Sequence, residues 1–197
     1  MFRLKLFYVF LLSAVFIVLV FSACNNSSNE KVEMTQAEKV ARGEFLITFG
    51  GCGDCHTPKV FTPNGPVPDT SKILSGCPSN TTIANVDPAL VKPGSWVLFT
   101  QDISAAVGPW GASFAANLTP DNETGIGTWN EEMFVNALRT GKHLGAGRPI
   151  MPPMPWELVR QHSDEDLKAM FAYLKSLKPI KNKVPDYLPP DKVFAKQ

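Results

Sequence analysis

The segment Cys52-Gly53-Asp54-Cys55-His56 holds the side chains of this sequence that are best placed to do chemistry together. Two thiols separated by two residues and followed at once by an imidazole match the attachment site of a c-type haem. In such a site each cysteine forms a thioether with a vinyl group of the porphyrin, and the histidine binds the iron as the proximal ligand. The spacing therefore predicts one covalent haem c, attached at Cys52 and Cys55, with His56 on the iron.

The cysteine pair also has interpretations that involve no haem. In a thiol-disulfide oxidoreductase, Cys52 would attack a substrate disulfide and Cys55 would resolve the mixed disulfide. Half of a zinc site would need further ligands, and the remaining cysteines are Cys24 and Cys77. A thioredoxin-like protein would place the motif after a strand in a βαβ series, and no such series follows residues 45–49. The haem interpretation is therefore favoured.

A haem iron that is bound by one histidine needs a second protein ligand or keeps an open coordination position. The candidate donors that follow the motif are His143, His162, Met133, Met151, Met154 and Met170. Met133 and Met170 stand at helical spacings that are typical of core residues. His162 stands one residue before a predicted helix cap, where we expect it to be exposed.

The loop of residues 148–156 is rich in proline, which restricts its backbone as a ligand loop requires. Met154 has a proline on each side, and we predict it as the distal ligand of the iron. Met151 is the second choice and His143 the third. A vacant or labile sixth position would instead indicate a haem sensor or a peroxidase-like protein.

Three segments with helical periodicity would position these residues, namely 35–49, 130–140 and 163–177. Thr35 and Glu38 form a capping-box pattern at the start of the first. Ser163 is the predicted cap of the last, and Gly141 ends the middle one. The motif of residues 52–56 thus follows the first helix, and the methionine loop lies between the other two.

The long segment 57–128 is rich in proline, glycine, serine and asparagine. A structureless loop of this length is unusual in a compact domain, so we expect a small hairpin and ordered turns packed on one side of the haem. Residues 96–100 are the predicted strand, with its return near 114–118. Cys77 has no evident disulfide partner and is expected to be a small buried residue.

The N-terminal residues resemble an export signal. Arg3 and Lys5 precede an apolar run from Leu6 to Phe21, and small residues then lead to Cys24. This pattern predicts a signal peptide over 1–23 and a lipid-modified Cys24, as in bacterial lipoproteins. A retained transmembrane helix is the alternative, although the run is short for one. We therefore expect an exported protein on the periplasmic side, anchored by lipid to a bacterial membrane.

The charge of the chain argues against a nucleic-acid partner. Removal of residues 1–23 leaves 17 basic residues against 18 acidic ones, a net charge of −1 with neutral histidines. Binding to phosphate backbones depends on a basic excess, which this composition lacks. The length of the mature chain fits a single domain.

The order of these features resembles the class I monohaem c-type cytochromes, over residues 36–186. A haem motif is followed by a short helix, a methionine loop and an amphipathic terminal helix. The stretches 117–121 and 124–129, with the proline-flanked Met154, are similar to the cytochrome domains that accompany bacterial membrane-bound dehydrogenases. Such subunits usually hold several haem motifs, whereas this sequence has one.

The resemblance implies an all-α, cytochrome c-like fold whose first and last helices cross beside the haem. Gly43 would allow their close approach, and a long irregular insertion would hold the small hairpin. The expected organisation is a signal peptide (1–23), a lipidated flexible linker (24–34), a cytochrome c domain (35–186) and an extended tail (187–197).

The function implied by the resemblance is that of a periplasmic, membrane-tethered electron carrier with no substrate chemistry of its own. His56 and Met154 would be the axial ligands of its one haem. A membrane-bound dehydrogenase or respiratory complex would be the electron donor, and an oxidase or another cytochrome would be the acceptor.

Overall fold

The computed structural model describes residues 33–194. Contacts divide the chain after Glu33, and the compact unit that holds the motif of residues 52–56 begins at Met34. The predicted signal peptide (1–23) and the predicted lipidation site, Cys24, lie outside the described residues. Within residues 33–194, no helix combines the length and the apolar character needed to cross a membrane.

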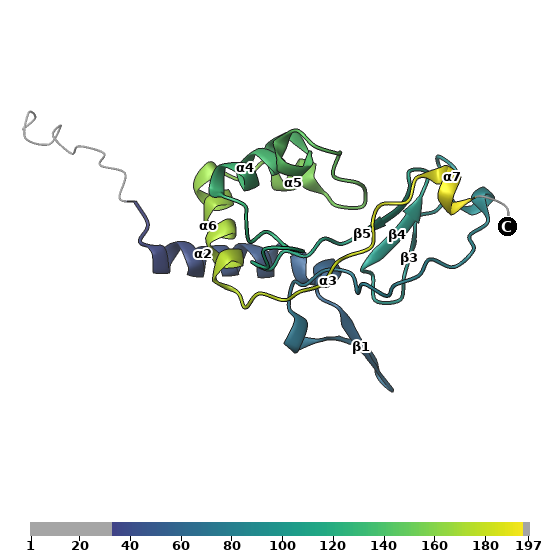
Figure 1. Ribbon diagram of the computed structural model, residues 1–197, viewed down its shortest axis with the longest axis horizontal. Coiled ribbons are helices and arrows are strands. Elements are labelled where there is room, and N and C mark those ends of the chain that lie inside the picture. The colour runs from purple at the N-terminus through teal and green to yellow at the C-terminus, as the bar shows by residue number, and fades with distance from the viewer. Residues whose placement is uncertain (1–32, 195–197) are drawn as a thin grey trace, which may run out of the picture. The chain divides into compact units, whose positions relative to one another are not determined.

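Helices and strands alternate irregularly along this unit (Figure 1). The α-helices are α2 (Gln36–Phe49), α3 (Cys52–His56), α4 (Glu131–Thr140), α5 (Trp156–Val159), α6 (Asp164–Ser176) and α7 (Pro190–Val193). Short 3-10 helices are η1 (Thr70–Lys72), η2 (Pro88–Leu90) and η3 (His143–Gly145). The strands are β1 (Lys59–Thr62), β2 (Gly65–Pro68), β3 (Leu98–Phe99), β4 (Ala105–Gly108) and β5 (Gly111–Phe114). In Figure 1, α6 crosses α2, and the strands β3–β5 lie on the other side of α3 from this crossing.

Helix α2 begins as predicted because Thr35 and Glu38 cap it reciprocally. The Glu38 N–H donates to Thr35 Oγ1 at 3.3 Å, and the Thr35 N–H donates to the Glu38 carboxylate at 2.8 Å. Helix α2 meets α6 at Gly43, where an added Cβ would lie 2.0 Å from the carbonyl oxygen of Ala169. The predicted close approach at Gly43 is confirmed, since only a residue without a side chain lets the two backbones meet there.

Helices α4 and α6 also begin at side-chain caps. Asn130 Oδ1 accepts the Met133 N–H at 2.8 Å, and Ser163 Oγ accepts the Asp166 N–H at 3.1 Å. Gly141 ends α4 in the left-handed conformation, with φ at 66°. The helices predicted over 130–140 and 163–177 are therefore confirmed to within a residue at each end.

Apolar side chains from α2, α4 and α6, with two from the segment between α3 and α4, form the main core of the unit. Its buried members are Leu46, Ile47, Leu74, Ile126, Phe134, Leu138, Leu167, Met170, Phe171 and Leu174. Leu167 and Leu174 are fully buried, so α6 contributes the centre of this cluster. Burial of side chains of this size contributes about 2 kcal/mol each, which makes helix packing the main stabilising term here.

The expectation of an all-α fold is wrong, because the segment between the motif and α4 forms two antiparallel sheets. Strands β1 and β2 form a hairpin in which Thr62 pairs with Gly65. Strands β3, β4 and β5 form a second sheet in that order. Strand β2 could not be recognised in the sequence because it contains prolines at 66 and 68. Proline has no N–H to donate and is found in strands that have a free edge.

The expected hairpin is present but has a different partner from the predicted one. Strand β3 lies inside the predicted strand 96–100, yet its Leu98 pairs with Val107 of β4 rather than with residues near 114–118. Strand β4 then turns at once into β5, so that Gly108 pairs with Gly111. The small residues of β4 and β5 show no polar and apolar alternation, because both strands are buried on their two faces.

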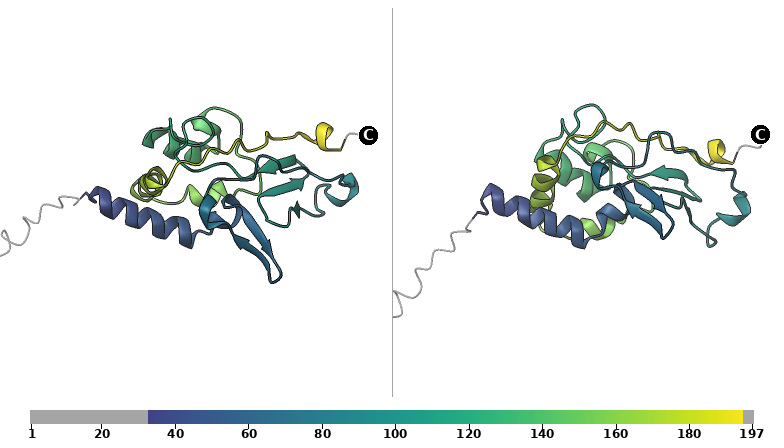
Figure 2. Two further views of the ribbon diagram at one scale, coloured as in Figure 1. Left: turned by 60° about the horizontal axis from the view of Figure 1, so that its bottom comes forward. Right: turned by 90° about the horizontal axis from the view of Figure 1, so that it is seen from below.

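The C-terminal segment returns from α6 to the second sheet. Figures 1 and 2 show this segment in yellow, running from α6 to α7 beside β5. Leu188 and Ala112 exchange two backbone hydrogen bonds at 2.8 and 3.0 Å. Val193 and Phe194 pack against a second core cluster that includes Val107. The described part of the predicted tail, residues 187–194, is therefore packed on the sheet.

Candidate functional site

The motif of residues 52–56 forms the short helix α3, which starts immediately after α2. Gly51 makes the turn between the two helices in the left-handed conformation, with φ at 66°. Cys52 and Cys55 are three residues apart on this helix and therefore share one face. Cys52 packs against the main core, and both thiols are free and partly exposed. The two thiols therefore lie on the same side of α3.

His56 is oriented by a backbone carbonyl from a distant segment. Its Nδ1 lies 2.8 Å from the carbonyl oxygen of Ala116, so Nδ1 carries the proton and donates it. This hydrogen bond fixes the ring and leaves Nε2 as the nitrogen that can bind a metal. Burial lowers the pKa of His56, although the bond to Ala116 opposes that change. Burial thus favours the neutral imidazole, which is the form that binds a metal.

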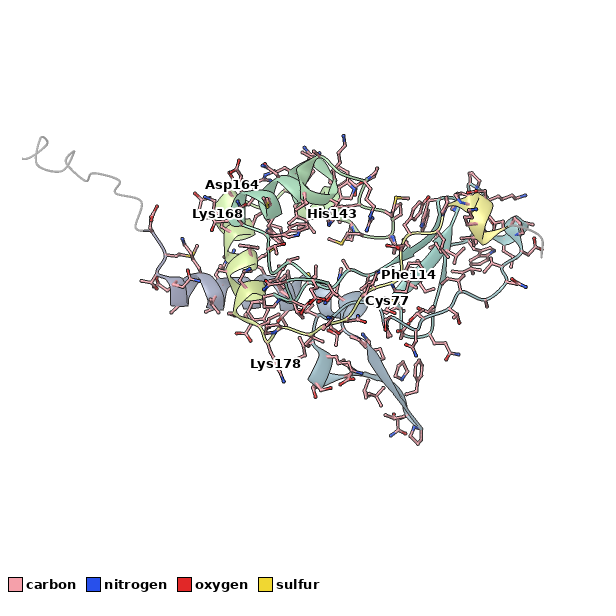
Figure 3. All side chains as sticks on the ribbon, in the orientation of Figure 1. Cys77, Phe114, His143, Asp164, Lys168 and Lys178 are labelled. Carbon is pink, nitrogen blue, oxygen red and sulfur yellow. The ribbon has the colours of Figure 1, made fainter. Side chains whose placement is uncertain are left out.

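The backbone around Ala116 is packed tightly beneath the motif. The Gly76 N–H donates to the His56 carbonyl at 2.7 Å, and the Cys77 N–H donates to Ala115 at 2.8 Å. An added Cβ at Gly76 would lie 2.6 Å from the carbonyl carbon of Ala116. Cys77 is fully buried, as predicted, and Figure 3 labels it close to Phe114 of β5.

Lys59 caps the carboxyl end of α3. Its ammonium donates to the carbonyl oxygens of Asp54 at 2.7 Å and of Thr57 at 2.8 Å. The last carbonyl groups of a helix have no backbone N–H to bond with. A cation at this position bonds to them and complements the helix dipole. Lys59 therefore holds the end of α3 at which His56 is located.

The environment of the two thiols argues against disulfide exchange. Burial raises the pKa of Cys52, and burial together with the charge of Asp54 raises the pKa of Cys55. An exchanging cysteine needs the opposite shift, because the thiolate is the attacking species. The zinc interpretation also gains no support, since residues 33–194 contain no cluster of three or more histidine, cysteine or acidic side chains suited to a metal ion.

The methionine loop packs against the same core as the motif. Met154 and Cys52 both lie against the main cluster, although 102 positions separate them in the sequence. The loop makes a turn in which the Met154 N–H donates to the Met151 carbonyl at 3.3 Å. The Trp156 N–H donates to the Met154 carbonyl at 2.9 Å.

Trp156 and Gly141 fasten this loop to the end of α4. An added Cβ at Gly141 would lie 2.5 Å from the Trp156 ring, so the indole rests directly on the glycine. The Ile150 N–H donates to the Gly141 carbonyl at 2.8 Å. The guanidinium of Arg160 lies over the indole of Trp156, 5.5 Å from the ring centre.

His143, the third choice for the distal ligand, is engaged elsewhere. Its ring and that of Trp129 form a T-shaped pair with their centres 5.1 Å apart, and Trp129 itself packs on the main core. Burial and the charge of Arg148 lower the pKa of His143. Figure 3 places His143 beside α4, near the start of the methionine loop.

These residues fit a covalently attached haem. The thiols share one face of α3, and the His56 ring donates through Nδ1, which leaves Nε2 available. Met154 and Cys52 pack against the same core. Sequence reasoning missed Ala116 because any residue can offer a carbonyl oxygen. Lys59 could have been found, since a cation just beyond a short helix is a capping signal.

Comparison with known proteins gives relatives that are parts of bacterial dehydrogenases. The chain is 39% identical over 77 residues to a subunit of the nicotinate dehydrogenase of Pseudomonas putida, a match covering 39% of this chain and 6% of that protein. It is 33% identical over 120 residues to the cytochrome c subunit of the quinone alcohol dehydrogenase of Gluconobacter oxydans, covering 52% of this chain and 25% of that subunit. It is 30% identical over 134 residues to the gluconate 2-dehydrogenase cytochrome c subunit of Pantoea cypripedii, covering 68% of this chain and 22% of that subunit.

The chain spans a quarter or less of the length of these relatives. No family model matches the sequence. The similarity is therefore to one section of much longer subunits.

Proposed function

Because this chain is homologous to cytochrome c subunits of bacterial dehydrogenases, we propose that it is an electron carrier with one covalent haem c and with His56 and Met154 as axial ligands. The observation that carries the proposal is the orientation of His56. This residue lies on α3 together with the two thiols, and its Nδ1 donates to the carbonyl oxygen of Ala116. That arrangement orients an imidazole for iron beside two attachment points for a porphyrin.

When bound, haem c supplies an iron that takes up and releases one electron. Cys52 and Cys55 would tether it, and α3 would keep both thiols on one side. The hydrogen bond to Ala116 orients the His56 ring. The methionine loop is fastened to α4 by Trp156 on Gly141. With both axial residues held by the fold, electron transfer would need little rearrangement of the protein.

The proposed donor is a dehydrogenase, and the proposed acceptor is an oxidase or another cytochrome. Support for the donor comes from the names of the relatives, which are cytochrome subunits of alcohol, gluconate and fructose dehydrogenases. We also propose that the protein is exported and anchored through an acylated Cys24. Support for the anchor comes from the sequence pattern of residues 1–24.

The haem proposal is tested by expressing the protein together with a haem-attachment system and extracting the denatured product with acidified acetone. Covalent haem should stay with the wild-type polypeptide, and the double variant Cys52→Ser, Cys55→Ser should lose it. Cys77→Ser is the matched control and should keep it, because Cys77 is fully buried and is not part of the motif of residues 52–56. Haem that extracts freely from the wild type would overturn the proposal.

The anchor is tested separately by mass spectrometry of the mature N-terminus. An acylated Cys24 is expected, and Cys24→Ser should release the protein from membranes. A mature chain that begins at Met1, or at an unmodified residue other than Cys24, would contradict the anchor and leave the haem proposal intact.

A further inference from the structure

A side chain of the second sheet reaches the methionine loop. The Ser113 hydroxyl, on β5, donates to the carbonyl oxygen of Pro152 at 2.5 Å. Pro152 lies between Met151 and Met154, and 39 positions separate it from Ser113. Ser113 is only 8% exposed, so water competes weakly for this bond.

The hydroxyl of Ser113 is itself oriented by Trp110. The indole Nε1 of Trp110 lies 3.2 Å from Ser113 Oγ, and an indole N–H can only donate. Ser113 Oγ accepts that hydrogen, which leaves its own hydrogen directed at Pro152. The two bonds form a chain with a fixed direction, from Trp110 through Ser113 to the loop.

The C-terminal segment holds Trp110 in turn. The Tyr187 hydroxyl donates to the Trp110 carbonyl at 2.5 Å. The Trp110 ring rests on Gly108, where an added Cβ would lie 2.4 Å from the indole. Gly111 is pressed against the Leu188 carbonyl, which would be 2.1 Å from an added Cβ. The sheet and the C-terminal segment thus give Ser113 a rigid support.

From this geometry we propose that Ser113 is a positioning residue for the iron–methionine bond. It fastens the Met154 loop to the second sheet, while Trp156 fastens the same loop to α4. Held from two elements, the loop keeps Met154 against the core and slows its exchange for other ligands. This inference rests on the proposed function, because it takes Met154 to be the distal ligand of a bound haem.

The test measures binding of imidazole to the oxidised holoprotein, which requires Met154 to leave the iron. Ser113→Ala should raise the apparent affinity for imidazole about five- to tenfold, the equivalent of one lost hydrogen bond. Ser113→Thr keeps the hydroxyl and should restore the affinity to within about twofold of the wild type. Trp110→Phe removes the orienting N–H and should give an intermediate increase. It also serves as the second variant if Ser113→Ala fails to fold.

Ser104→Ala is the matched control, because Ser104 is also buried, but its hydroxyl bonds to Asp102 and Cys77 and not to the loop. It should lower thermal stability without changing imidazole affinity. Unchanged affinity in Ser113→Ala, or an equal rise in Ser104→Ala, would overturn the positioning role. Failure of the proposed ligation is distinguishable, because the wild type would then lack the weak far-red band of a sulfur-to-iron charge transfer before any variant is made.

Discussion

The imidazole Nδ1 of His56 and the carbonyl oxygen of Ala116 are 2.8 Å apart, although 60 positions separate the two residues in the sequence. The motif is therefore completed by a backbone atom from the segment that follows β5. Gly76 lies against that segment and also bonds to the His56 carbonyl. The chemistry of the local motif thus depends on packing between remote parts of the chain.

Gly76→Ala should disturb this packing. The residue has φ at +82°, and a new Cβ would collide with Ala116, so we expect a loss of about 3 kcal/mol in the free energy of unfolding. Displacement of Ala116 would weaken its bond to His56, make the imidazole a poorer electron donor and raise the midpoint potential. Denaturant titration and spectroelectrochemistry measure the two effects.

Gly94→Ala is the control for this variant. Gly94 has nearly the same backbone angle, with φ at +80°, and no atom within 4 Å of an added Cβ. It should cost only about 1 kcal/mol and leave the potential unchanged. Equal behaviour of the two variants would show that the collision at Ala116 is unimportant.

Met154→Ala should remove the far-red charge-transfer band, lower the potential and open the iron to carbon monoxide. The physical reason is that a thioether ligand stabilises ferrous iron and occupies the sixth position. Met151→Ala should leave all three properties nearly unchanged. The reverse pattern would make Met151 the ligand. If neither variant had an effect and the wild type were high-spin, a haem sensor or peroxidase-like protein would replace the electron carrier.

Gly43→Ala should separate α2 from α6. The new Cβ would lie 2.0 Å from the Ala169 carbonyl oxygen, and neither backbone can move without disturbing the core. A loss of roughly 2 to 3 kcal/mol is expected from such overpacking, measured by thermal or denaturant unfolding. Gly53→Ala is the control, since its Cβ would meet Thr57 Oγ1 at an ordinary 3.5 Å. A comparable loss of stability in Gly43→Ala and Gly53→Ala would contradict the close contact of α2 with α6 at Gly43.

The ion pair between Arg42 on α2 and Asp166 on α6 should stabilise the fold in a pH-dependent way. The atoms Arg42 Nε and Asp166 Oδ1 are 2.8 Å apart, and the bond to Arg42 lowers the pKa of Asp166. The carboxylate form is favoured in the folded state, so the contribution is complete above the ordinary pKa of 3.8 and disappears as the pH falls through the lowered value.

Asp166→Asn should therefore lower the free energy of unfolding by about 0.5 to 1 kcal/mol at pH 6, and this difference should vanish towards about pH 2. Glu123→Gln provides the comparison, because the Glu123 and Lys181 side chains are 70% and 68% exposed. Its effect should be near zero throughout. A difference for Asp166→Asn that persists at the acidic end would refute the ion-pair explanation.

Local signals account for what could be predicted from the sequence. The capping residues Thr35, Asn130 and Ser163 act within three residues of their own positions, so the helix starts are visible in the sequence. The spacing of Cys52 and His56 is likewise local. These elements and the residues of the motif needed no knowledge of the tertiary structure.

The sheets were harder to predict because their signals are weak or distant. Asn64-Gly65 is a turn signal that could have indicated the first hairpin, but the prolines that follow it oppose a strand. The pairing of Ala112 with Leu188 joins residues that are far apart in the sequence. Ser113 carries no motif at all, and its bond to Pro152 follows only from the folded structure.

The crossing of α2 and α6 has a consequence for the biogenesis of the protein. A chain is synthesised from its N-terminus, so the cysteines that follow α2 exist before α6, which must pack on α2, has been made. Until residues 164–176 have been made, the main core lacks Leu167, Met170, Phe171 and Leu174. Under the proposed function, an attachment enzyme would meet the two thiols before α6 has packed on α2, and the packing of α6 would then close the core beside the motif.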